Sequence, residues 1–268
     1  MAGRSLLAGL VFLGALALSA WPTVPAGKLE EGSLGGRRIW VYTPPGYDAA
    51  AKTPYDLLIA FDGREYVEDI ALPAILDALL AEKKAPAFVA VLIDNGTGAP
   101  RLADLGNRES FAAFLSGQLI PYVRERWTVT RDPRHTIVAG SSAGGLAAAF
   151  VAYRHPEVFG NVLSQSGAFW RGPEASNEPP FEWLTGQYAA SPRKDIRFVL
   201  EVGSRESAGA LGGSAPSILE ANRRLRDTLL RKGYDVAYTE VPDGTHSTET
   251  WRARLPAMIA RMLSAPSP

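Results

Sequence analysis

The sequence contains no cysteine and only three histidines among its 268 residues. Without cysteine the protein can form neither a thiolate nucleophile nor a disulfide, and it cannot bind zinc or an iron–sulfur cluster through sulfur. Three histidines are few for a multi-histidine metal site, so we expect no bound metal. They also leave only three candidates for a catalytic imidazole.

An excess of charge of either sign is also missing, because 28 Lys and Arg residues balance 28 Asp and Glu residues. The sequence has no run of five or more like charges. A neutral chain offers no positive field to a phosphate backbone, so nucleic acid is not an expected partner. The remaining composition, 46% hydrophobic and 21% charged, is that of an ordinary globular protein.

Residues 1–26 have the character of a leader. One charge, Arg4, precedes an uncharged stretch over 6–18, and small residues and prolines follow. This order is typical of an export signal. Cleavage after Ala20 or after Ala26 would satisfy the small-residue rule equally well, and both sites stay open.

An uncleaved membrane anchor is the weaker interpretation of the same leader. Its uncharged stretch over 6–18 is short, whereas a helix needs about 20 residues to cross a hydrocarbon core of ~30 Å. We therefore expect an exported protein, periplasmic or secreted, with no stable membrane insertion after signal removal. The mature chain, 27–268, is long enough for one large core in a single domain.

Short apolar, β-branched runs alternate with longer amphipathic segments along the mature chain. This alternation predicts the α/β class, with a central, mostly parallel sheet flanked by helices. We expect strands over 38–43, 57–61, 88–93, 136–139, 161–164, 196–202 and 236–241. We expect helices over 70–83, 109–126, 143–153, 218–231 and 248–263. Residues 171–194, rich in Pro, Gly, Ser and Asn, predict a long loop or lid over one end of the sheet.

The pattern Gly-x-Ser-x-Gly occurs at residues 140–144, between an expected strand and a helix of small residues. A tight strand-to-helix turn needs glycine on both sides of the serine, because a Cβ there would strike the neighbouring strand or helix. The turn also leaves the N–H of Ala143 unpaired at a helix N-terminus, where it can donate to an oxyanion. We therefore predict that Ser142 is a nucleophile; the alternative is a plain Gly-Ser turn.

A serine needs an imidazole within hydrogen-bond reach to take its proton. His135 precedes the strand that leads to Ser142 and should lie near the opposite end of that strand. His155 follows the next helix, about 15 Å from the turn. His246 lies in a turn after the last expected strand, where the carboxyl ends of a parallel sheet gather their loops. Elimination favours His246 as the base, against a plain surface-loop role.

The acid of a hydrolase triad should follow a strand between the serine and the histidine. Glu206 lies in the loop after the strand expected over 196–202 and can turn back toward His246. Glu201 belongs to the strand itself, which suits a paired structural carboxylate. Asp243 is only three residues before the histidine and suits a local turn. We favour Glu206 and keep the other two as alternatives.

A second oxyanion donor should come from the loop after an earlier central strand. The strand expected over 57–61 is followed by Asp62, Gly63 and Arg64. Glycine allows a close backbone approach, so the N–H of Arg64 or of Gly63 itself should complete the oxyanion hole. The alternative for this segment is a plain Asp-Gly turn.

Aromatic and basic side chains near the same end of the sheet are candidates for binding substrate. Phe169, Trp170 and Trp251 could form the wall of an acyl or aromatic pocket, with core packing as the alternative. Three arginines could surround its mouth and suit an anionic or polyphenolic ligand: Arg64, Arg108 and Arg171. The alternative is that these arginines serve only solubility.

Motifs spread over about residues 36–262 resemble the esterase D family, and most closely its enterochelin (ferric siderophore) esterase branch. They are Phe61-Asp62-Gly63, Asn107-Arg108-Glu109, Ala139-Gly140-Ser141-Ser142-Ala143-Gly144-Gly145, His155-Pro156 with Phe159-Gly160, Ser164-Gln165-Ser166-Gly167-Ala168-Phe169-Trp170, Glu201-Val202-Gly203 with Arg205-Glu206, and Asp243-Gly244-Thr245-His246 with Trp251-Arg252.

The resemblance implies an α/β-hydrolase (esterase) domain over 27–268 without cofactor, and a triad carried here by Ser142, Glu206 and His246. The family also includes feruloyl and acetyl-xylan esterases, thioester hydrolases and mycolyltransferases, so the resemblance does not fix the substrate. We expect an exported serine carboxylic-ester hydrolase whose partner is a small-molecule ester, of siderophore or aromatic, feruloyl type. The alternatives are an acyltransferase with the same triad and a non-catalytic siderophore or glycan binder.

Overall fold

An eight-stranded sheet runs through the molecule in the order β1-β2-β4-β3-β5-β6-β7-β10. The computed structural model describes residues 24–263, so most of the expected leader lies outside the described residues. From β4 to β10 neighbouring strands are parallel, and β1 and β2 form an antiparallel edge. The strands are β1 (Lys28–Leu34), β2 (Arg37–Thr43), β3 (Asp56–Phe61), β4 (Phe88–Ile93), β5 (Thr136–Ser141), β6 (Asn161–Gln165), β7 (Arg197–Gly203) and β10 (Asp235–Val241).

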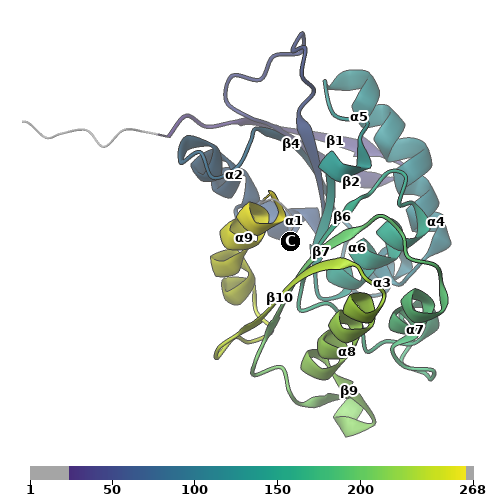
Figure 1. The fold of residues 1–268 in the computed structure, drawn as a ribbon. Coiled ribbons are helices and arrows are strands. Elements are labelled where there is room, and N and C mark those ends of the chain that lie inside the picture. Colours follow the sequence, from purple (N-terminus) through teal and green to yellow (C-terminus); the bar gives the residue numbers. More distant parts are fainter. Residues whose placement is uncertain (1–23, 264–268) are drawn as a thin grey trace, which may run out of the picture.

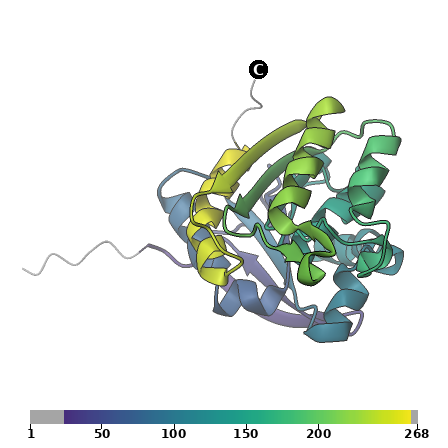
Figure 2. The same cartoon turned by 90° about the horizontal axis from the view of Figure 1, so that it is seen from below.

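Helices cover both faces of this sheet (Figure 1). Their bounds are α1 (Gly63–Glu68), α2 (Leu72–Ala81), α3 (Gly98–Leu105), α4 (Glu109–Phe114), α5 (Ile120–Arg126), α6 (Ala143–Arg154), α7 (Trp183–Ala190), α8 (Ile218–Arg231) and α9 (Thr248–Leu263). Helices α1, α2 and α9 lie on one face, and the others lie on the opposite face (Figure 2). Successive residues of β3 point into the two cores in turn, with Ile59 in one and Leu58 in the other. The α/β class and the mostly parallel sheet are confirmed.

All seven expected strands are present within two residues of the expected bounds. Sequence periodicity does not indicate β1, because its residues are nearly all exposed and show no apolar alternation. The expected loop over 171–194 is partly wrong, since it contains α7. Two short strands, β8 (Gly209–Ala210) and β9 (Ala215–Ser217), form a separate hairpin before α8.

The helix expected over 109–126 is interrupted by a π-helical turn, η1 (Leu115–Leu119). Pro121 has no N–H to donate to the carbonyl of Gly117, so the regular α-helical pattern cannot continue through this point. The hydroxyl of Ser116 donates to the carbonyl of Ala112 at 3.1 Å, which also loosens the helix. A π-turn joins α4 to α5 at this place.

The carboxyl ends of β3, β5, β6, β7 and β10 meet at one edge of the sheet, and the loops that follow them carry the candidate site residues. Within residues 24–263, no helix is both long enough and apolar enough to span a bilayer.

Candidate active site

Ser142 forms a sharp turn between β5 and α6. Its backbone has φ 56° and ψ −119°, a conformation that costs a non-glycine residue about 1–3 kcal/mol. Its N–H donates to the carbonyl of Gln165 at 2.9 Å, and its carbonyl accepts from the N–H of Ala168 at 2.9 Å. A Cβ on Gly140 would lie 2.4 Å from the backbone carbon of Gly144, so only glycine fits there. The surrounding backbone thus holds the serine in its strained conformation.

An imidazole lies between Ser142 and a buried carboxylate. Nε2 of His246 is 3.0 Å from the Ser142 hydroxyl, and Nδ1 is 2.6 Å from Oε2 of Glu206. Since a carboxylate only accepts, Nδ1 carries the proton in this pair, and the lone pair of Nε2 is free to accept from the serine. The structure therefore brings the three predicted residues together from the loops after β5, β7 and β10.

The Glu206 carboxylate is fixed on its other side as well. Its side chain is only 3% exposed, and Oε1 accepts from the Gly203 N–H at 2.8 Å and from the Ser166 hydroxyl at 2.6 Å. The sequence motifs alone assign no role to Ser166. Its position directly after β6, at the same edge of the sheet as Ser142, was the signal that could have found it.

The two alternative carboxylates have other partners. Glu201 on β7 is buried and pairs with Arg254 of α9 at 2.8 Å. The side chain of Asp243 is 81% exposed and pairs with Arg205 at 2.8 Å. Both contacts fit the structural roles considered for these residues, and Glu206 is the carboxylate that contacts His246.

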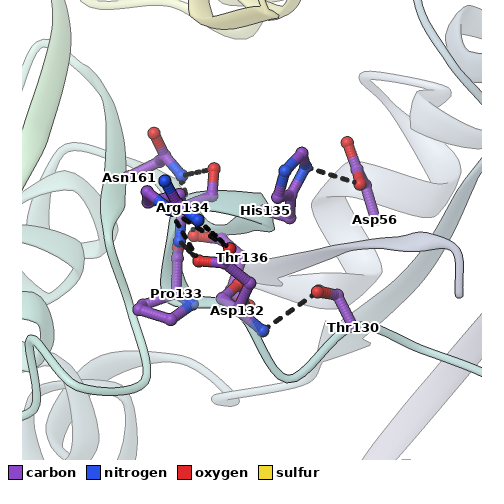
Figure 3. Close-up of polar contacts among 8 residues, drawn as sticks. All are labelled: Asp56, Thr130, Asp132, Pro133, Arg134, His135, Thr136 and Asn161. Atoms are coloured by element: carbon purple, nitrogen blue, oxygen red, sulfur yellow. Dashed lines mark hydrogen bonds and ion pairs between the residues drawn. The ribbon is translucent and has the colours of Figure 1, made fainter.

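The other two histidines lie away from Ser142. His135 precedes β5 at the amino end of the sheet, where Nδ1 is 3.0 Å from Oδ1 of Asp56 (Figure 3). His155 caps the far end of α6, between the hydroxyl of Ser116 at 3.2 Å and the carboxylate of Glu157 at 3.0 Å. Among residues 24–263, no three His, Asp or Glu side chains form a group that could hold a metal ion.

The backbone amides expected to form an oxyanion hole lie at two helix N-termini. Ala143 is the first residue of α6, while Gly63 and Arg64 are the first two residues of α1. Such N–H groups have no acceptor within their own helix. A Cβ on Gly144 would lie 3.2 Å from the carboxylate of Asp62, so the loop before α1 packs against the first turn of α6.

Asp62 anchors this loop. It is buried in the left-handed conformation, with φ 56°, and its carboxylate receives two hydrogen bonds from Arg101, at 2.6 and 2.8 Å. Its N–H donates to the side chain of Asn95 at 3.0 Å. Burial alone would lower the pKa of Arg101, but hydrogen bonding to Asp62 and the charge of that carboxylate raise it overall. This pair is not evident from the sequence, because Arg101 lies 39 residues after Asp62 along the chain.

The structure corrects part of the expected aromatic pocket. Phe169 is fully buried and belongs to the hydrophobic core, so it cannot touch a ligand. Trp251 is 7% exposed, and its indole N–H donates to Ser166 at 3.0 Å, so it also packs inside the molecule. Trp170 is 7% exposed as well and carries the guanidinium of Arg171 over its ring, 4.7 Å from the ring centre.

The three predicted arginines differ in their surroundings. Arg64 is exposed, and Arg108 is paired with the carboxylate of Glu174. Arg171 is half-buried and donates only to neutral oxygens, the carbonyl of Ala175 at 2.8 Å and the side chain of Asn177 at 2.9 Å. Burial and the nearby charge of Arg101 lower the pKa of Arg171. In the described part of the chain, Arg171 has no carboxylate in ion-pair contact, so its charge is uncompensated.

Residues 34–262 match the model of the family described as "Putative esterase". The chain belongs to this esterase family. It is 32% identical to the iron(III) enterobactin esterase of Dickeya dadantii, over 82% of this chain and 50% of that protein. It is 30% identical to the iron(III) enterobactin esterase of Escherichia coli K12, over 87% of this chain and 56% of that protein. The chain thus spans about half the length of the curated relatives it matches.

Solved structures agree with this membership. The enterobactin esterase FES from Shigella flexneri, crystallised in the presence of enterobactin, aligns with a TM-score of 0.75 and 27% sequence identity. The alignment covers 90% of the present chain and 62% of the Shigella chain. A ferulic acid esterase from Anaeromyces mucronatus aligns with a TM-score of 0.69 and 17% identity, over 90% and 92% of the two chains, and shows the fold alone. The expected family resemblance and the α/β-hydrolase fold are confirmed.

Proposed function

We propose that this chain is a serine carboxylic-ester hydrolase with Ser142 as nucleophile, His246 as base and Glu206 as acid. The observation that carries the proposal is the continuous hydrogen-bonded set from the Ser142 hydroxyl through the imidazole to the buried carboxylate. Membership of the esterase family supports the same reaction class.

The reaction follows from these contacts. Nε2 of His246 takes the hydroxyl proton while Oγ of Ser142 attacks the ester carbonyl carbon. The carbonyl oxygen becomes an oxyanion, which receives hydrogen bonds from the Ala143 N–H and from the N–H of Arg64 or Gly63. The imidazolium, stabilised by Glu206, gives its proton to the leaving alcohol. Water, deprotonated by the same imidazole, then releases the acid and regenerates the serine.

An ester with an aromatic acyl group, of siderophore or feruloyl type, is the substrate class we favour, and the charge of Arg171 suits an acyl group that is anionic. Two features support it. The uncompensated charge of Arg171 lies in the segment that follows β6, and the carbonyl of Ser142 accepts a hydrogen bond from Ala168 of that segment. The relatives named above are enterobactin esterases, and a ferulic acid esterase shares the fold.

Export of the protein is a second part of the proposal. The single charge and the uncharged stretch within residues 1–26 support an export signal, and the mature domain would be 27–268. Fractionation of expressing cells, with mass determination of the mature chain, tests it. A mature protein that keeps residue 1 and stays in the cytoplasm would refute export.

Ser142→Ala tests the hydrolase. We expect it to fold and to lose at least about 10³-fold in kcat on p-nitrophenyl and feruloyl esters and on a ferric trilactone siderophore, because the nucleophile is gone. Labelling by a fluorophosphonate should disappear as well. Ser116→Ala is the matched control and should keep full activity. Ser116 also contacts a histidine, but this is His155 at the far end of α6 from Ser142. Wild-type turnover by Ser142→Ala would overturn the assignment.

A further inference from the structure

A second pair of side chains lies behind the Ser142–His246–Glu206 set. The indole N–H of Trp251 donates to the Ser166 hydroxyl at 3.0 Å, and that hydroxyl donates to Oε1 of Glu206 at 2.6 Å. Ser166 is 2% exposed and Trp251 is 7% exposed, so neither exchanges these partners with bulk water. The chain of donors ends on the carboxylate oxygen that does not face His246.

The direction of these hydrogen bonds is fixed by chemistry. An indole N–H can only donate, so the Ser166 oxygen must accept from Trp251. The hydroxyl proton of Ser166 is then left for an acceptor, and the Glu206 carboxylate is that acceptor. With the Gly203 N–H as a second donor, Oε1 is held in one place, and this determines where Oε2 can meet the imidazole.

The same tryptophan also contacts the base. Its ring and the imidazole of His246 meet edge to face, with centroids 5.0 Å apart and planes at 85°. Trp251 is held in turn by the side-chain amide of Gln165, which donates to its carbonyl at 2.9 Å. Ser166 adopts a positive φ of 50°, and its N–H donates to the carbonyl of Glu201 at 2.7 Å. A strained backbone, held by this hydrogen bond, therefore aims the Ser166 hydroxyl at Glu206.

We propose that Ser166 and Trp251 are positioning residues that fix Glu206 and His246 in their reactive arrangement by one shared relay, Trp251 N–H to Ser166 hydroxyl to Glu206 carboxylate. The inference rests on the proposed function. Because both side chains are buried and act through Glu206 and His246, they set the rate of nucleophile activation and leave substrate binding unchanged. Trp251, expected from the sequence to bind substrate, has this role instead.

Two substitutions separate the members of the relay. Ser166→Gly removes the hydroxyl and suits the positive φ, so the backbone is relieved and folding is kept. Trp251→Phe keeps an aromatic ring beside the imidazole and removes only the N–H. A hydrogen bond to a charged group is worth about 10–100-fold, so we expect Ser166→Gly to lower kcat by about that factor with KM unchanged. Trp251→Phe should lower kcat by less, about 3–10-fold, because the indole acts through the hydroxyl.

The double variant is the deciding measurement. Once the Ser166 hydroxyl is absent, the indole N–H has no route to Glu206, so Ser166→Gly with Trp251→Phe should show the kcat of Ser166→Gly alone. The rate of fluorophosphonate labelling of Ser142, measured without any substrate, should fall in the same way: slightly in Trp251→Phe, and more strongly and equally in Ser166→Gly and in the double variant. Ser116→Ala and Trp127→Phe are matched controls from the far end of the sheet and should match wild type in both assays.

Each outcome has a distinct meaning. Losses that multiply in the double variant, a rise in KM without a fall in kcat, or a wild-type labelling rate in folded Ser166→Gly would overturn the relay while the hydrolase assignment stands. A wild-type protein that neither hydrolyses the esters nor reacts with the fluorophosphonate would overturn the proposed function, and the relay with it.

Discussion

Replacement of Glu206 by glutamine is the sharpest test of the site, because it removes a charge with almost no change in shape. The carboxylate accepts three hydrogen bonds, one from His246 and two from Ser166 and Gly203. A glutamine amide has one accepting oxygen and one donating NH₂ group, so it cannot serve both sides. Whichever way the amide turns, one side of the network fails.

The cost can be worked out for each orientation. With the amide NH₂ toward the imidazole, Nδ1 must accept and Nε2 must carry the proton, so Nε2 cannot take the proton of Ser142. The same tautomer error in serine protease triads costs about 10⁴-fold in kcat, or about 5.5 kcal/mol. With the oxygen toward the imidazole, the Gly203 N–H would face another donor, and a buried unpaired donor costs about 1–3 kcal/mol. The amide therefore adopts the first orientation, in which its oxygen still accepts from Gly203 and Ser166 but the imidazole is held in the inactive tautomer.

We therefore expect Glu206→Gln to lower kcat on a p-nitrophenyl ester by about 10³–10⁴-fold, with KM little changed and the fold intact by circular dichroism. Glu201→Gln is the matched control, because it is an equally buried glutamate at the same edge of the sheet that pairs with an arginine and does not contact the histidine. A Glu206→Gln protein within tenfold of wild-type kcat would refute the reasoning.

Three further predictions concern stability. Glu201→Gln should lower the free energy of unfolding, measured in urea, by about 1–2 kcal/mol. This is less than the loss of a fully buried ion pair costs, because the side chain of its partner Arg254 is over a third exposed. Gly140→Ala should lower the free energy of unfolding by about 3 kcal/mol or more in the same assay, since its Cβ would lie 2.4 Å from the backbone of Gly144. Gly117→Ala is the control: its Cβ would have nothing within 4 Å, so its free energy of unfolding should stay within about 1 kcal/mol of wild type. Hydrogen bonds from Arg134 lower the pKa of Asp132 from 3.8 to about 2, so this aspartate stabilises the fold above pH 3.8 and the effect is lost as the pH falls toward 2. Asp132→Asn should therefore lower the urea midpoint at pH 6 and leave it nearly unchanged at pH 2; an equal decrease at both pH values would contradict this.

The sequence predicts the strands of the sheet and its mostly parallel character well, because buried strands consist of continuous apolar runs. The strand β4, for example, is buried at all six positions. Strand β1 has no such apolar run, because it is polar and exposed and pairs with a neighbour along one edge only. Its sequence therefore does not indicate a strand. The π-turn at η1 depends on the spacing of Ser116 and Pro121 within one helix, and hydrophobic periodicity does not report such spacing.

The candidate site shows a similar division. Motifs and chain order are enough to predict Ser142, Glu206 and His246, which the fold brings into contact. Exposure is not readable from residue type, so Phe169 looks like a pocket wall in the sequence and is a core residue in the structure. Contacts such as Ser166 with Glu206 join positions that are 40 residues apart, and only the folded chain reveals them.

The unmatched charge of Arg171 has a consequence for how the protein meets its ligand. The half-buried guanidinium of Arg171 is bonded only to neutral oxygens, so its charge remains available to attract an anion. Dissolved salt screens this attraction, and the screening length falls from about 10 Å at 0.1 M salt to about 3 Å at 1 M. Capture of a negatively charged ester should therefore slow as ionic strength rises, while capture of a neutral ester of the same size should not. The ionic strength around the protein would then help to select which esters it consumes.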